Sequence, residues 1–245
     1  YGALGMFEAR ATLIEAARQT TGTAGLPFFD LGSADVVFSF GANFLETWLS
    51  PLAYSRGYGN LRQGKLGKRG YLVSFEARQS VTSGVADEWI PVIPGSEGLV
   101  AKAIGRLAAQ INGGTIPTAF ADLDLAQAVQ QSGVSEEKLH HLAELFAQAQ
   151  QPLAIPGGAA LGHVNGLASA KAILALNALK SYDLDVARLR LVTNDMNGIF
   201  RVDTRGGEKY ILRVTLPEGG HSLDHVTAEM DWLAALARDT DLSVP

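Results

Sequence analysis

The sequence predicts an α/β fold with a parallel β-sheet, followed by a small α+β unit with antiparallel strands. Two observations carry this prediction. Short apolar strands alternate with amphipathic helices as far as Lys180, and three strands then follow one another closely. Alternation implies parallel pairing through right-handed crossovers, whereas short links between strands imply antiparallel pairing. We therefore expect two domains, residues 1–180 and residues 181–245.

The composition is that of a globular chain without thiol chemistry. Of 245 residues, 47% are apolar and 18% are charged, which is enough for a sizeable core. The net charge of -5, with no basic stripe interleaved with aromatic residues, argues against nucleic acid as a partner. The absence of cysteine excludes disulfides, thiolate zinc sites and cysteine-held iron–sulfur clusters within this sequence. No apolar run approaches the roughly 20 residues of a membrane-spanning helix, so we expect no direct membrane span.

The elements of the first domain follow from periodicity and from residues that start or stop helices. We expect Leu13 and Ile14 to face inward from a first helix that ends at Gly22. A short apolar run that stops at Gly41 predicts a buried parallel strand. The expected helices cover residues 8–19, 96–111, 135–150 and 166–180, the strands cover 34–40, 71–75 and 153–155, and residues 56–70 form a Gly- and Arg-rich loop.

The second domain begins where the spacing of the strands shortens. Three strands are expected at residues 188–192, 198–203 and 209–214. A hairpin turn at residues 204–207 links the last two, which predicts antiparallel pairing. A helix over residues 222–238 follows, with its apolar residues on one face. Both Tyr1 and Pro245 are interpreted as truncation points of a longer chain.

Three polar clusters are expected at the carboxyl ends of the parallel strands, where ligands of open α/β sheets bind. Gly41 lets a ligand approach the backbone, and Asn43 offers both a donor and an acceptor. Glu76 and Glu97 can accept hydrogen bonds from a guanine base or a ribose. Together these clusters would suit a dinucleotide, and the candidate residues are Gly41, Asn43, Glu76, Arg78, Gly95, Ser96 and Glu97.

Phosphate groups would lie against Arg78 and the free N–H groups near Ser96. The alternative is that Gly, Asn and Ser end strands and cap helices here for local reasons alone. The glycine-rich run at residues 156–162 also has two interpretations: it could bind a phosphate group before a helix, or it could form a tight turn. His221 and His225 have the i, i+4 spacing that could hold a metal, but the residues between them favour a solvated helix start. No metal site and no catalytic residue is predicted.

Four motifs in order resemble the molybdopterin oxidoreductases of the dimethyl sulfoxide reductase family over about residues 28–179. They are GANFLET (41–47), FEARQSVT (75–82), ADEWIP (86–91) and PGSEG (94–98). The resemblance implies a Rossmann-like sheet domain whose motifs help to bind molybdopterin guanine dinucleotide. The segments FGANFLETW (40–48) and SPLAYSR (50–56) are most similar to the molybdopterin-oxidoreductase-like subunit of alternative complex III, which implies partner subunits in a membrane electron-transfer complex.

Several residues depart from the pattern of that family. Phe44 and Ala77 stand where the family has Pro, and Glu76 and Glu97 stand where it has Asp. Each Glu is one methylene longer than Asp, which alters the geometry of the site. The segments that carry the family's metal ligand are absent, and the branch includes subunits thought to lack molybdenum, so redox catalysis by this chain alone is not expected.

A kinase nucleotide lobe needs a turn over the phosphates, a cation on a strand and a carboxylate on the next helix, and the second domain has a candidate for each. Asn197, Arg213 and Glu229 fill these places, although a hairpin turn with a strand-to-helix salt bridge is the simpler alternative. The segments LVTNDMNGIFRV (191–202), YILRV (210–214) and AEMDWL (228–233) resemble aminoglycoside and homoserine kinase-type phosphotransferases over residues 182–245. The resemblance implies ATP as a ligand, with Arg213 in place of the usual Lys. The family's catalytic Asp would lie beyond Pro245.

Three functions follow from these patterns. The first is a fragment of a bacterial respiratory molybdopterin-type oxidoreductase subunit joined to a kinase nucleotide lobe, with neither part catalytically complete. The second is an ATP-dependent small-molecule phosphotransferase. The third is a non-catalytic scaffold subunit of a membrane electron-transfer complex. The first domain is expected at a membrane through partner subunits, and the kinase-like lobe in the cytoplasm.

Overall fold

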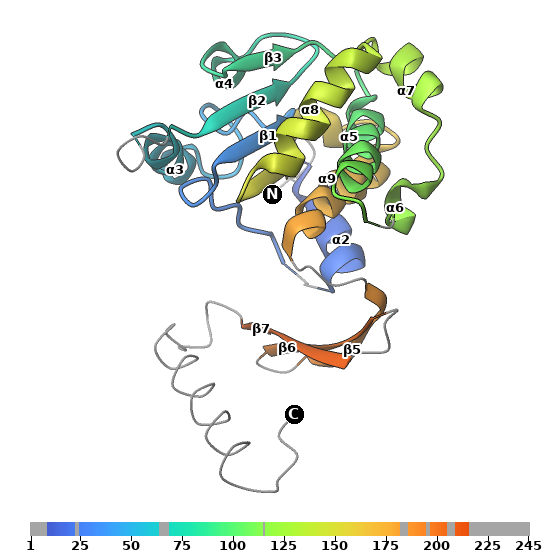
Figure 1. Cartoon of the computed structure of the whole chain (residues 1–245). Coiled ribbons are helices and arrows are strands. Elements are labelled where there is room, and N and C mark those ends of the chain that lie inside the picture. Colours follow the sequence, from blue (N-terminus) through green and yellow to red (C-terminus); the bar gives the residue numbers. More distant parts are fainter. Residues whose placement is uncertain are drawn as a thin grey trace, which may run out of the picture. The chain divides into compact units, whose positions relative to one another are not determined.

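The computed structural model of the chain describes residues 9–22, 25–63, 69–114, 116–181, 186–194, 197–204 and 209–215. The chain divides into two units, Tyr1–Asp183 and Leu184–Pro245, each of which is described by itself (Figure 1). Among the described helices, none is long and apolar enough to cross a bilayer.

The first unit is built on a four-stranded parallel sheet with the strand order β3-β2-β1-β4 (Figure 1). The strands are β1 (Val36–Phe40), β2 (Tyr71–Phe75), β3 (Glu88–Ile90) and β4 (Pro152–Pro156). Phe40 pairs in register with Phe75 and with Pro156, and Phe75 pairs with Ile90. The carboxyl ends of all four strands therefore lie level with one another. The predicted α/β class with a parallel sheet is confirmed.

Helices connect these strands and pack around the sheet. The longer ones are α2 (Arg10–Thr21), α3 (Pro51–Gln63), α5 (Glu97–Ile111), α7 (Leu125–Ser132), α8 (Glu136–Gln148) and α9 (Gly166–Ser181). The shorter ones are α4 (Val81–Gly84), α6 (Thr118–Ala121) and the 3-10 turn η1 (Gly158–Leu161).

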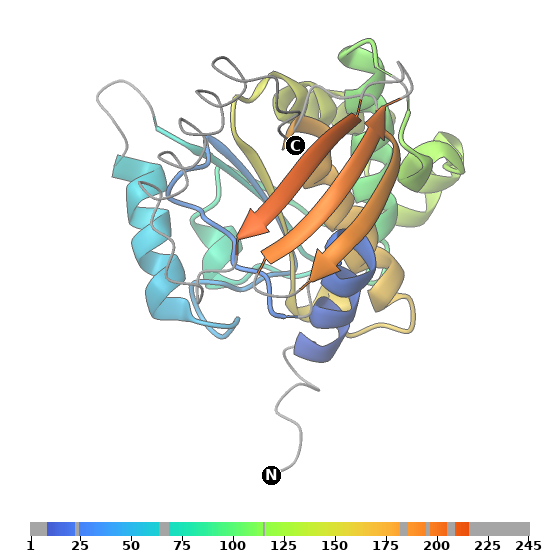
Figure 2. The same ribbon diagram turned by 90° about the horizontal axis from the view of Figure 1, so that it is seen from below.

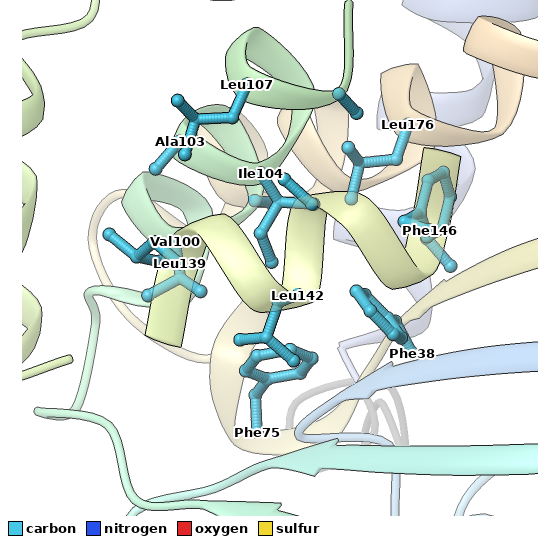
Figure 3. Close-up of a cluster of buried hydrophobic side chains, with 14 of the residues drawn as sticks. Phe38, Phe75, Val100, Ala103, Ile104, Leu107, Leu139, Leu142, Phe146 and Leu176 are labelled. Carbon is cyan, nitrogen blue, oxygen red and sulfur yellow. The ribbon is translucent and has the colours of Figure 1, made fainter. Parts of the chain in front are cut away.

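One hydrophobic core lies between the sheet and helices α5, α8 and α9 (Figure 3). The rings of Phe38 and Phe75 are 5.4 Å apart, and the rings of Phe38 and Phe146 are 5.2 Å apart. Ile104 of α5 and Leu142 of α8 complete the cluster, and all of these side chains are fully buried. Side chains alternate between the two faces of a strand, so the burial of Phe38 in this core fixes which face of β1 is turned towards helices α5, α8 and α9.

The second core lies on the opposite face of the sheet, against α2 and α3. Val37 and Leu72 belong to it, one residue away from strand residues that face the first core. Its aromatic part is formed by Trp48, whose ring lies 5.2 Å from Tyr54 and 5.8 Å from Phe29. Both faces of the sheet are thus covered, as near-continuous apolar strands require.

Two expectations for the first unit are wrong. Residues 56–63 belong to helix α3 rather than to a loop, because the burial of Tyr54 and Leu61 and the ion pair between Arg62 and Asp87 hold a helix that contains two glycines. Ile14 does not face inward and is 37% exposed.

The second unit contains a three-stranded antiparallel sheet with the order β5-β6-β7 (Figure 2). Its strands are β5 (Val186–Asn194), β6 (Asn197–Thr204) and β7 (Lys209–Thr215). The antiparallel pairing agrees with the predicted hairpins. Three antiparallel strands do not identify a kinase lobe, and the helix expected over residues 222–238 lies outside the described residues.

Candidate functional site

The candidate site lies at the carboxyl edge of the parallel sheet. The hydrogen bonds between neighbouring strands continue one residue past β1, β2 and β4. The N–H of Gly41 donates to Phe75 O at 3.0 Å, and that of Gly157 donates to Phe40 O at 3.1 Å. The N–H of Glu76 donates to Ile90 O at 3.3 Å. Gly41, Glu76 and Gly157 therefore stand side by side where the chain leaves β1, β2 and β4.

The loops after β1 and β4 meet at the point where the strand order reverses, the usual ligand position in such sheets. Gly158 has a φ of 48°, and a Cβ there would lie 2.2 Å from the carbonyl oxygen of Gly41. Gly41 itself has a φ of 67°. Both residues must be glycine for this approach, so the freedom of Gly41 serves a contact between two loops of the chain.

Glu76 is held from within the protein. Its Oε1 accepts hydrogen bonds from the hydroxyl groups of Ser74 at 3.0 Å and Ser80 at 3.1 Å. Burial raises the pKa of Glu76, and the two serine hydrogen bonds and the charge of Arg78 oppose that effect. Arg78 is exposed to solvent. Glu76 and Arg78 thus both follow β2, and the Arg78 side chain is exposed to solvent whereas the Glu76 carboxyl group is buried.

Further hydrogen bonds join the loop after β1 to helix α4, which follows β2. Glu46 Oε1 accepts the N–H of Val81, the first residue of α4. The N–H of Leu45 donates to the Thr82 hydroxyl at 3.2 Å. A carboxylate at the start of α4 satisfies backbone donors that a phosphate would otherwise use.

The third predicted cluster lies at the start of α5. The hydroxyl of Ser96 donates to Ile93 O at 2.6 Å, so it does not cap the helix. Glu97 is only 3% exposed in the first turn. A Cβ on Gly98 would lie 2.7 Å from Ser169 Cα. The amino-terminal turns of α5 and α9 are therefore in direct contact.

An open hollow of about 440 Å³ lies beside these helix starts, lined by Pro94, Gly95, His163, Val164 and Asn165. Gly95, with a φ of 86°, faces the ring of His163, and its carbonyl accepts a hydrogen bond from Asn165 Nδ2 at 2.7 Å. Sequence reasoning missed His163 and Asn165. Their place just before a helix that follows a parallel strand is the signal that could have found them.

Three buried side-chain polar atoms in the described part of the chain have no hydrogen-bond partner, and all three come from this region. They are Asn43 Oδ1, Trp48 Nε1 and Glu97 Oε2. A Cβ on Gly157 would lie 2.5 Å from Trp48 Nε1, so the indole N–H reaches the loop after β4. Leaving such an atom unsatisfied costs about 1 to 3 kcal/mol. Two acceptors and one donor suit the mixed donor and acceptor edge of a guanine or pterin ring.

The other predicted residues are placed only in part. Asn197 pairs with Thr215, and Arg213 pairs with Ile199 in the second sheet. Glu229 lies outside the described residues. Within the part of the chain that the structure describes, no group of three or more His, Asp or Glu residues could hold a metal ion.

Comparisons with known proteins found a protein that is similar in sequence and a solved structure that is similar in fold. No family model matches the chain. The chain is 27% identical, over 158 residues, to the molybdopterin-binding-like subunit of menaquinone reductase from Nitratidesulfovibrio vulgaris. It is a distant relative of that subunit. The match covers 62% of this chain and 23% of that protein.

The fold is similar to that of acetylene hydratase from Pelobacter acetylenicus, with a TM-score of 0.55 and 15% sequence identity. The superposition covers 76% of this chain and 27% of that chain, and at this identity it shows a common fold alone. The chain thus spans about a quarter of the length of each of these two proteins.

Proposed function

We propose that the first unit is the cofactor-domain part of a molybdopterin-type oxidoreductase subunit, and that the carboxyl edge of its sheet binds a pterin guanine dinucleotide. The similarity to the menaquinone reductase subunit supports the class of protein. The observation that carries the site is the group of three unpartnered buried atoms, Asn43 Oδ1, Trp48 Nε1 and Glu97 Oε2. A buried polar atom without a partner requires an explanation, and a bound ligand would supply the missing partners.

In this proposal the chain binds and orients the dinucleotide, and the cofactor supplies redox chemistry when bound. Glu97 Oε2 and Asn43 Oδ1 would accept N–H groups of the guanine. Arg78 and the first turn of α5 hold phosphate oxygens. Glu76 supports the site through Ser74 and Ser80. Membership of a membrane complex of the alternative complex III type, with other subunits as partners, is part of the same proposal.

A scaffold subunit without cofactor is the second candidate, and a specific observation favours it. Glu46 already occupies the start of α4, and Glu76 is already bonded to two serines. These contacts fill from within two places that a ligand would otherwise take. Binding of a guanine nucleotide separates this candidate from the first.

Binding of ATP by the second unit is a separate proposal. It rests on the sequence resemblance, and the antiparallel pairing of β5, β6 and β7, with Arg213 on β7, is compatible with it. The phosphotransferase function and the roles of Asn197 and Glu229 rest on the sequence resemblance, and they are independent of the dinucleotide site.

Guanosine diphosphate, which carries base, ribose and pyrophosphate, tests the site by calorimetry. We expect the wild type to bind it, and Glu97→Gln to weaken binding by about 1.5 to 3 kcal/mol, the range for hydrogen bonds to a charged group. Glu144→Gln on α8 is the matched control, because it removes the same charge from an exposed position. Equal binding by all three proteins would remove Glu97 from the site, and no binding by the wild type would favour the scaffold.

A further inference from the structure

The outer side of β4 is an edge of the parallel sheet, because β4 is the last strand in the order β3-β2-β1-β4. The backbone groups of Gln151 and Gly157 bond towards β1: Gln151 O accepts from Asp35, and Gly157 N donates to Phe40. Backbone direction alternates along a strand. Positions 152, 154 and 156 therefore direct their backbone groups outward.

Only one outward N–H exists along this stretch. Pro152 and Pro156 have none, because proline lacks a backbone donor. Ala154 between them supplies the single remaining donor, together with its carbonyl oxygen. An edge with so few donors is a poor template for another strand.

Asn177 on α9 satisfies both outward groups of Ala154. Its Oδ1 accepts the Ala154 N–H at 2.7 Å, and its Nδ2 donates to the Ala154 carbonyl at 3.0 Å. The side-chain amide thus makes the pair of bonds that a neighbouring strand would make. Ile173 and Leu176 of the same helix belong to the first core, which holds α9 against the sheet.

We propose that Asn177 and the two prolines close this edge, so that no partner subunit or second copy adds a strand beside β4. The occupant of the edge is α9 of the same chain. This inference is independent of cofactor binding.

Amide hydrogen exchange on the wild type tests the closure directly. The Ala154 N–H is expected to exchange as slowly as that of Ile155, which points into the sheet. Asn177→Leu keeps a side chain of similar size but removes both bonds, and the Ala154 N–H should then exchange at least about tenfold faster, the factor that corresponds to about 1.4 kcal/mol. Asn165→Leu is the control, since Asn165 also donates to a backbone carbonyl but lies in a loop.

Sedimentation of the same proteins measures the consequence for assembly. A triple variant with Asn177→Leu, Pro152→Val and Pro156→Val restores outward donors, and we expect it to self-associate at lower concentration than the wild type. Asn165→Leu should sediment as the wild type does. Rapid exchange of the Ala154 N–H in the wild type would overturn the proposal, whether or not the variants fold.

Discussion

Replacing Phe38 by alanine is expected to lower the free energy of unfolding of the first unit by about 3 to 5 kcal/mol, the usual cost of deleting a buried phenyl ring. Phe38 is completely buried, and its ring packs against Phe75 of β2 and Phe146 of α8. The deletion leaves a cavity between the central strand and the helix layer. Chemical denaturation followed by far-ultraviolet circular dichroism measures the loss.

Phe28→Ala is the matched control, because Phe28 is 75% exposed. Its ring lies 6.0 Å from Tyr54 at the surface, so the same deletion should cost less than about 1 kcal/mol. Equal losses for the two variants would contradict the assignment of β1 to the centre of the core.

Gly158→Ala is expected to destabilise the first unit by about 2 to 5 kcal/mol. A left-handed backbone costs a non-glycine residue about 1 to 2 kcal/mol. The added methyl group would also lie 2.2 Å from the carbonyl oxygen of Gly41, so the loops after β1 and β4 must separate, and overpacking of this kind costs about 1 to 3 kcal/mol. Thermal and chemical unfolding of the variant measure the sum.

Gly162→Ala in the same loop provides the comparison. The nearest atom to a Cβ at this position is 3.6 Å away, and its φ of -81° suits any residue. Its stability should stay within about 0.5 kcal/mol of the wild type. A loss of stability as large as that of Gly158→Ala would show that the loops after β1 and β4 do not approach each other as described.

Strong local signals explain which parts of the fold the sequence predicts. The strand ending at Gly41 and the strand at residues 71–75 are short apolar runs bounded by turn residues, and both are observed. Helix α8 begins after Ser135, whose hydroxyl accepts the Lys138 N–H, as an amino-terminal serine predicts. These features depend on neighbours in sequence.

The elements that sequence reasoning missed depend on distant contacts. Helix α3 contains two glycines, which disfavour a helix in isolation. Arg62 nevertheless bonds to Asp87 at 2.6 Å and to the Tyr58 hydroxyl at 2.9 Å, and Leu61 is buried beneath it. Strand β3 has three residues and exists by pairing with β2. Neither the contacts of Arg62 nor the pairing of β3 with β2 can be recognised from residues that are neighbours in the sequence.

The candidate site also combines features that the sequence predicts with features that depend on contacts between distant residues. Sheet topology alone brought Gly41 and Glu76 to one edge, as the sequence predicted. The packing of Trp48 on Gly157, and of Glu46 on the start of α4, joins residues that are far apart in sequence. Those contacts decide which buried polar atoms of the described residues have a hydrogen-bond partner within the chain and which have none.

Hydrogen–deuterium exchange with and without guanosine diphosphate tests the dinucleotide site most directly, because it locates the ligand without relying on a variant. The proposal predicts slower exchange in the loop after β1 at residues 41–48 and in the first turn of α5, with no change in the central turns of α8. Slower exchange confined to other parts of the chain, or no change at saturating nucleotide, would contradict a dinucleotide site at the carboxyl edge of the sheet.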